Sequence, residues 1–145
     1  MTLQLFGTAT SCSGLERSSR AVVRLKVLGT GPNADDHDFY IVRSQADFGQ
    51  AIREKRNSIF VINGATGVDL SSMHSDARII TVPPKFSYLD SDDILGIHSK
   101  SGKFRSLFRS NSRHNSFLVT ERCNNYCLMC SQPPKDIDDR WILDK

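Results

Sequence analysis

Residues 38–62, DFYIVRSQADFGQAIREKRNSIFVI, decide the fold class of this chain. The segment 38–43 (DFYIVR) is rich in aromatic and β-branched residues, which favour a strand. The segment 59–62 (IFVI) indicates a second, buried strand. Between them, 44–56 has the pattern of a helix, with Ser44 as a candidate N-cap. A strand, a helix and a strand in close succession predict a mixed α/β fold.

The expected helix carries its own start signal and an apolar side. Asp47 lies three residues after Ser44 and approximates the acidic member of a capping box. The apolar side consists of three residues at helical spacing, namely Phe48, Ala51 and Ile52. We expect this side of the helix to face the protein core.

Further strands are predicted on both sides of this unit. Residues 21–28 (AVVRLKVL) precede it, and 78–82 (RIITV) follow it and end at two prolines. Residues 94–99 and 103–109 are expected to form a hairpin around a Lys-Ser-Gly turn. We therefore expect residues 1–110 to form a small mixed α+β N-terminal domain.

The second strand of the expected hairpin is basic. No Asp or Glu occurs from Ser99 to Thr120, a stretch that contains Lys100, Lys103, Arg105, Arg109 and Arg113. Side chains alternate along a strand, which places Phe104, Ser106 and Phe108 on one face and the lysine and arginines of 103–109 on the other. Two interpretations remain open. The basic residues form either a solvated strand face or a groove for an acidic peptide or a phosphate.

Two smaller segments are expected to be exposed connections. Asp90, Asp92 and Asp93 are interpreted as a solvated turn, because a calcium loop would need more regular ligands and a closing Glu. Residues 109–115 (RSNSRHN) are polar throughout and are expected to be a linker.

Composition and charge exclude several classes of protein. The 145 residues are 39% hydrophobic and 24% charged, as in ordinary globular domains. No apolar run approaches the roughly 20 residues that span a bilayer, and the N-terminus lacks the pattern of a secretion signal. The net charge of +3 is too small to indicate nucleic-acid binding by itself. We expect a cytoplasmic protein that binds neither membranes nor nucleic acid.

The cysteines carry the strongest functional signal. Three of the four, Cys123, Cys127 and Cys130, fall within eight residues in a C-x3-C-x2-C spacing. A disulfide framework would spread its cysteines along the chain. Clustered thiolates instead indicate a metal or iron–sulfur site in a reducing compartment. Cys12 stands alone and is expected to be structural or incidental.

The number of clustered thiolates helps to choose between metals. A structural zinc site needs four protein ligands, so Cys12 or a histidine such as His114 would have to supply the fourth. A cubane iron–sulfur cluster with three thiolates leaves one iron open. There the amino and carboxylate groups of S-adenosyl-L-methionine (SAM) can chelate, and an electron from the cluster can generate a radical from SAM. The spacing favours radical SAM chemistry; zinc, and chance or disulfide use, remain alternatives.

The flanking residues narrow the interpretation. Residues 115–134, NSFLVTERCNNYCLMCSQPP, resemble radical SAM enzymes and, more narrowly, the His-Xaa-Ser system radical SAM maturases of the C type. The resemblance implies that Cys123, Cys127 and Cys130 ligate a [4Fe-4S] cluster, and that Met129 lies against the adenine of SAM. It also implies a peptide or protein substrate, with His-Xaa-Ser repeats as a candidate feature, and a partner maturase subunit as a further candidate.

Length sets the extent of the expected barrel. A radical SAM core is a full or partial β/α barrel, with about 30 residues per repeat and about 250 in a full barrel. Only fifteen residues follow Cys130. Residues 111–145 are therefore expected to hold the first strand (116–120), the cluster loop and the start of the first helix. The expected fold class is α/β, a mixed α+β N-terminal domain followed by the beginning of an incomplete radical SAM β/α barrel.

Three functions remain open at this point. The chain is interpreted as a radical SAM maturase that is present as a truncated or N-terminal fragment, or as a short form that a partner completes. Alternatively, residues 1–110 are a binding module for a partner peptide without catalysis. The third alternative is a structural zinc domain.

Overall fold

The chain is represented by a computed structural model that describes residues 5–15, 20–29, 31, 35–63, 67–113, 115, 136, 138 and 140. Within these residues lie eight strands, one α-helix and one short 3-10 helix. In chain order they are β1 (Phe6–Thr8), β2 (Ser11–Ser13), β3 (Ala21–Lys26), β4 (Asp38–Val42), α1 (Gln45–Arg53), β5 (Ser58–Ile62), β6 (Arg78–Val82), η1 (Pro84–Phe86), β7 (Ile94–His98) and β8 (Lys103–Phe108).

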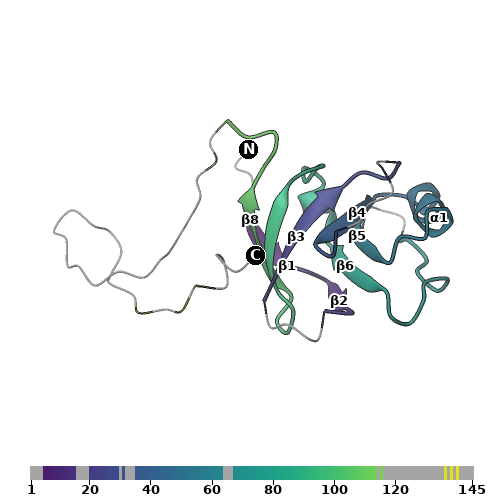
Figure 1. Cartoon of the computed structure of the whole chain (residues 1–145), viewed down its shortest axis with the longest axis horizontal. Coiled ribbons are helices and arrows are strands. Elements are labelled where there is room, and N and C mark those ends of the chain that lie inside the picture. Colours follow the sequence, from purple (N-terminus) through teal and green to yellow (C-terminus); the bar gives the residue numbers. More distant parts are fainter. Residues whose placement is uncertain are drawn as a thin grey trace.

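The described strands form one mixed sheet, with the order β1-β8-β7-β3-β4-β5-β6-β2. Strands β3, β4, β5 and β6 are parallel to one another, whereas β7, β8, β1 and β2 pair antiparallel with their neighbours. Helix α1 connects β4 to β5 and lies against their outer face (Figure 1). The predicted mixed α/β class is therefore confirmed for the described part of the chain. The expected barrel strand 116–120 lies outside it.

Helix α1 begins as the sequence predicts. The Ser44 hydroxyl accepts a hydrogen bond from the Asp47 backbone N–H, and the Asp47 carboxylate accepts one from the Ser44 N–H, which completes the capping box. Phe48 and Ala51 are buried against β4 and β5. The prediction was wrong for Ile52, which is 38% exposed, because each helical residue is turned about 100° from the one before and Ile52 lies past the contact with the sheet. Within the described residues, no helix is both long and apolar enough to cross a lipid bilayer.

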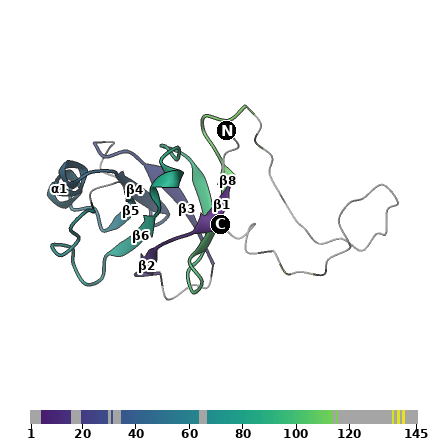
Figure 2. The ribbon, with the colours of Figure 1, turned by 180° about the vertical axis from the view of Figure 1, so that it is seen from behind.

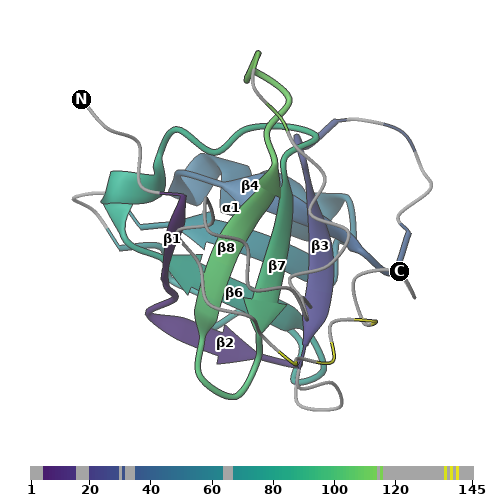
Figure 3. The same ribbon diagram turned by 90° about the vertical axis from the view of Figure 1, so that its left-hand side faces the viewer.

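The sheet is curled, so that its two end strands are consecutive in the chain. Strand β1 pairs with β8 and β2 with β6, and only Ala9 and Thr10 separate β1 from β2. The Ala9 N–H donates to the Gly102 carbonyl and the Thr10 N–H to the Thr81 carbonyl. Figure 3 shows this segment as it passes from one end strand to the other. The sequence pattern predicts neither strand, because three residues are too few to show a period of two.

The main core fills the inside of the curl. Its buried members come from β3 to β8 and from the segment after β6: Val23, Leu25, Phe39, Ile41, Phe60, Ile62, Ile80, Val82, Phe86, Leu89, Leu95, Ile97 and Phe104. A smaller cluster lies on the other face, beneath α1: Val42, Phe48, Ala51, Ile59 and Val61. Both clusters draw on β4 and β5, which explains why every residue of these two strands is buried.

Residues 83–93 cover the end of the curl at which the parallel strands finish. Phe86 and Leu89 from this segment are fully buried. The Leu89 carbonyl accepts a hydrogen bond from Arg43, which directly follows β4. The backbone of Asp92 and Asp93 exchanges hydrogen bonds with Leu25, near the end of β3. The opposite end, where β3 to β6 begin, has no such cover among the described residues.

Strands β7 and β8 form the predicted hairpin, at the opposite side of the molecule from α1 (Figure 2). Leu95 pairs with Ser106 whereas Ile94 pairs with Phe108, so β8 contains an extra residue and a β-bulge. The alternation predicted for 103–109 holds at its start, where Phe104 is buried and Arg105 is exposed, and is interrupted at the bulge.

Candidate functional site

The sequence-predicted site lies outside the described residues. Cys123, Cys127, Cys130 and Met129 belong to this part of the chain, as does the alternative zinc ligand His114. The iron–sulfur and SAM sites therefore stay predictions. Among the residues that the structure does describe, no three His, Cys, Asp or Glu side chains gather as a metal site would require.

Cys12 is described, and it has a place in the sheet. It lies on β2 opposite Ile80 of β6, half-buried against the main core. Burial raises the pKa of its thiol, which disfavours the thiolate that binds metals and reacts with electrophiles. This environment is that of a structural cysteine, in line with the expectation from its isolation in the sequence.

A cavity among the described residues lies at the uncovered end of the sheet. It has a volume of about 1000 Å³ and is bounded by the end of β2 and the beginnings of β3, β5 and β6, together with the residues before and in β4. Its polar lining includes Arg20, His37, Asn57, Ser58 and Arg78, and the acidic residues Asp36 and Asp76. The cavity therefore opens at the amino ends of the parallel strands, opposite the end that residues 83–93 cover.

Arg78, the first residue of β6, is held firmly in the wall of this cavity. Its Nε donates to the Ser58 hydroxyl at 2.9 Å and its Nη1 to the Asp36 backbone carbonyl at 2.6 Å. The guanidinium carbon lies 5.2 Å from the centroid of the Phe39 ring. No carboxylate of the described residues forms an ion pair with it. The positive charge of Arg78 is thus fixed in position and not neutralised by a carboxylate there.

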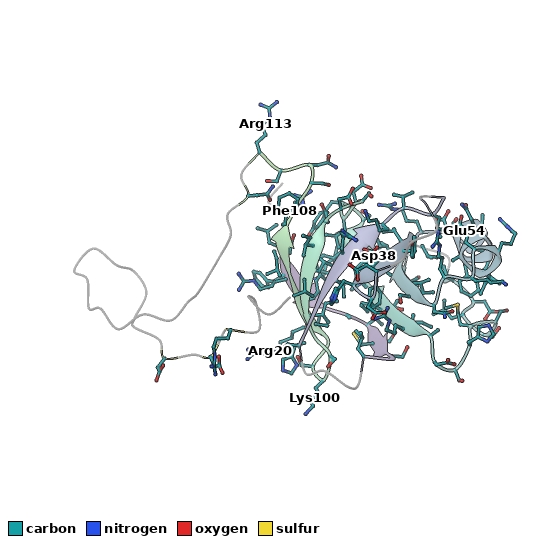
Figure 4. The ribbon with its side chains drawn as sticks, in the orientation of Figure 1. Arg20, Asp38, Glu54, Lys100, Phe108 and Arg113 are labelled. Carbon is teal, nitrogen blue, oxygen red and sulfur yellow. The ribbon has the colours of Figure 1, made fainter. Side chains whose placement is uncertain are left out.

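Two other cationic or titratable side chains lie at the cavity. Arg20 is exposed at the lower end of β3 in Figure 4, and its Nη1 donates to the Asp138 carbonyl at 3.3 Å. The half-buried His37 comes just before β4, and its backbone carbonyl accepts from the Arg24 N–H. His37 is placed by the pairing of β3 with β4, and Arg20 directly precedes the part of β3 that pairs with β7.

Beside the cavity, an ion pair fixes the start of β4. The Asp38 carboxylate is 2% exposed, accepts from Arg24 Nε at 2.6 Å and also accepts from the Asp35 N–H. Burial alone would raise the pKa of Asp38, but the hydrogen bonds from Arg24 and Asp35 and the nearby positive charges outweigh burial and lower it. Asp38 is therefore ionised at neutral pH and holds the chain just after His37.

A second buried carboxylate contradicts the sequence interpretation. Asp93, expected in a solvated turn, is 1% exposed. Its carboxylate accepts hydrogen bonds from the backbone N–H of Asp90 and from both the N–H and the hydroxyl of Ser110. The expectation was wrong because the turn precedes a strand whose hairpin partner, β8, leads directly to Ser110 and covers the carboxylate.

The expected linker after β8 is a hydrogen-bonded turn over the residues described there. The Asn115 side chain accepts from the Arg109 N–H and donates to the carbonyls of Arg109 and Ser112. The Arg109 guanidinium lies over the Tyr88 ring, 4.8 Å from its centroid. Burial raises the pKa of Tyr88, although Arg109 acts in the opposite direction. Arg109 is thus packed into the fold and does not belong to a solvated basic face.

The other basic residues of the hairpin are exposed. Lys103 and Arg105 lie opposite Thr8 and Phe6 of β1, so these four side chains share the outer face of the sheet. Phe6 is 68% exposed. Figure 4 shows Lys100 at the hairpin tip and Arg113 beyond the end of β8, both directed away from the sheet. We call Phe6, Lys103 and Arg105 the basic face.

Comparison of the chain with protein-family models and with curated proteins finds no match. Arguments about function therefore rest on the residues themselves.

Sequence reasoning missed Arg78 and Asp93 as important positions. Arg78 stands at the start of a predicted strand and looks like any solvated strand residue, since its partners Ser58 and Asp36 come from separate segments. The Asp90–Asp93 pattern has one usable signal. An aspartate directly before a buried strand is a position where a carboxylate often binds backbone N–H groups.

Proposed function

We propose that this chain is an iron–sulfur protein of the radical SAM type that modifies a peptide or protein. The observation that carries the proposal is the C-x3-C-x2-C spacing of Cys123, Cys127 and Cys130, together with its flanking residues. Three thiolates are the right donor set for a cubane cluster with one open iron. Bound there, SAM supplies radical chemistry, and this chain's cysteines hold the cluster.

The proposal extends to the surroundings of the cysteines. Residues from 111 onward would form the first strand, the cluster loop and the start of the first helix of a β/α barrel. Met129, directly before the last cysteine, is proposed to lie against the adenine of SAM. We propose a cytoplasmic location, since thiolate-bound clusters need a reducing compartment, and a maturase subunit as a partner.

Anaerobic reconstitution of the full chain tests the cluster. We expect the wild type to take up iron and sulfide in equal amounts. Alanine at Cys123, Cys127 or Cys130 should abolish this uptake, because the two remaining thiolates would not retain a cubane cluster. The matched control is Cys12→Ala, which removes a half-buried thiol of β2 and should leave iron uptake unchanged. Iron and sulfide analysis with absorption spectroscopy measures the result. Uptake of one zinc and no iron would reject the proposal.

We further propose that the peptide substrate docks on the basic face. The exposed ring of Phe6 lies opposite Arg105 in the β1–β8 pair, and Lys103 lies two residues away on the same face. An exposed aromatic side chain beside two cationic residues suits a peptide that carries both acidic and apolar residues. No acidic residue occurs in the surrounding sequence from Ser99 to Thr120.

Charge reversal tests this docking surface. We expect Lys103→Glu with Arg105→Glu to weaken binding of a fluorescein-labelled peptide of Glu and Leu residues by about tenfold or more, because attraction becomes repulsion. Fluorescence anisotropy at two salt concentrations gives the affinity. Arg53→Glu with Lys55→Glu, on the α1 side of the molecule, applies the same change in charge as a control. Equal affinity of the two double variants would exclude the basic face. Arg109 is left intact because it packs on Tyr88.

A further inference from the structure

We propose that the cavity at the amino ends of β3 to β6 binds a small molecule with one oxyanionic group, a carboxylate or a phosphate, and that Arg78 is its main contact. This inference stands apart from the cysteine motif, because every residue it uses lies among the described residues, in the sheet or in the segments that lead into its strands.

The state of Arg78 is the first argument. A guanidinium that is half-buried loses part of its hydration, and hydrogen-bond acceptors or an anion must replace the lost water. Arg78 has an ordered setting on Ser58, Asp36 and Phe39, yet no carboxylate of the described residues pairs with it. Its Nη2 makes no hydrogen bond to any described residue. A planar guanidinium with free N–H groups is the side chain best suited to hold a carboxylate or phosphate through two hydrogen bonds.

The fixed position of Arg78 is the second argument. Nε and Nη1 are engaged by groups on two different segments, the Ser58 hydroxyl of β5 and the Asp36 carbonyl before β4. Ser58 is itself only 7% exposed. The guanidinium therefore needs little reordering when an anion binds, and a prearranged donor gives more affinity than a mobile one.

The rest of the lining limits the class of ligand. Away from Arg78 the lining has one cation, Arg20, and two carboxylates, Asp36 and Asp76, which disfavours a second anionic group. His37 and Asn57 offer further hydrogen bonds. The carboxylates instead favour hydroxyl or ammonium donors on the part of the ligand away from Arg78. A volume of about 1000 Å³ is ample for such a molecule. The ligand class is thus a hydroxylated or amino compound with a single carboxylate or phosphate.

The experiment uses the full chain and two probes that share this chemistry, glycerol 3-phosphate and gluconate, with glycerol as the neutral control. The Nε–Hε resonance of Arg78 is followed by ¹⁵N NMR and is assigned in the wild type through its scalar couplings to the side-chain carbons of Arg78. We expect at least one probe to shift this resonance saturably, with a dissociation constant of about 1 mM or lower, and glycerol to leave it unchanged. The probe that binds more tightly identifies a phosphate or a carboxylate as the natural group.

The variants separate binding from general charge effects. Arg78→Lys keeps the charge and loses the planar fork, so we expect calorimetry to give affinity reduced about tenfold or more. Arg53→Lys, at the end of α1, should bind as the wild type does. The inference is overturned if neither probe shifts the Arg78 resonance saturably, or if the Arg53 resonance shifts to the same extent. Because the NMR readout uses the wild type, the result holds even if Arg78→Lys folds poorly.

Discussion

Replacing Gly7 by alanine is expected to lower the free energy of unfolding by about 2–3 kcal/mol, the upper part of the range for adding a methyl group to a packed core. Gly7 pairs with Phe104 on the inner side of β1. A Cβ there would lie 2.2 Å from Cζ and 2.8 Å from Cε2 of Phe86. The Phe86 ring is fully buried and packs edge-on against Phe104 at 4.8 Å between centroids, so it has little room to move.

Urea denaturation followed by circular dichroism measures this effect. Gly67→Ala is the matched control, because a Cβ at that glycine meets nothing within 4 Å. The combination of Gly7→Ala with Phe86→Leu removes the clash. It should therefore lower the free energy of unfolding by less than the sum of the two single changes. Equal stability of Gly7→Ala and the wild type would show that the ring and β1 separate easily, which contradicts the packing described.

The second large effect is expected at Asp93. Asp93→Ala removes a buried carboxylate and leaves the N–H groups of Asp90 and Ser110 without their acceptor. The variant loses hydrogen bonds to a charged group and keeps buried donors without an acceptor, so we expect its free energy of unfolding to fall by about 2–4 kcal/mol. The same change should free the turn after β8, since the Ser110 hydroxyl also donates to Asp93.

Two measurements separate the loss of global stability from the local opening of the turn after β8. Urea denaturation gives the change in stability, and amide hydrogen exchange at Ser110 reports the local opening. Asp76→Ala, at an exposed carboxylate that Ser75 contacts through its hydroxyl, provides the control and should change stability by about 0.5 kcal/mol or less. Slow exchange of the Ser110 amide in Asp93→Ala would mean that other contacts hold this turn.

Sequence patterns predicted the parts of the fold that depend on neighbouring residues. Strands β4 and β5 are nearly continuous apolar runs because both of their faces are buried, and the helix start follows from Ser44 and Asp47. The patterns failed where the deciding contact is distant. Strands β1 and β2 are defined by their pairing with β8 and β6, and the bulge in β8 is defined by its pairing with β7.

One candidate site depends on residues that are close in the sequence, and the other depends on residues that are far apart in it. The cysteine motif is visible in the sequence because its ligands lie within a few residues of one another, and the fold of the described residues adds nothing to it. The cavity around Arg78 is the opposite case. Its lining comes from the beginnings of strands that are far apart in the chain. The Arg78 guanidinium is positioned by its contacts with Ser58, Asp36 and Phe39. Only the assembled sheet brings these groups together.

The positions of β1 and β2 at the start of the chain also limit the order in which the strands can pair during synthesis. Phe6 pairs with Arg105 and Cys12 with Ile80. Strands β1 and β2 are therefore synthesised well before the strands with which they pair. Long-range pairing of this kind slows folding. We therefore expect β2 to stay unpaired until β6 has emerged, and β1 to stay unpaired until β8 has emerged.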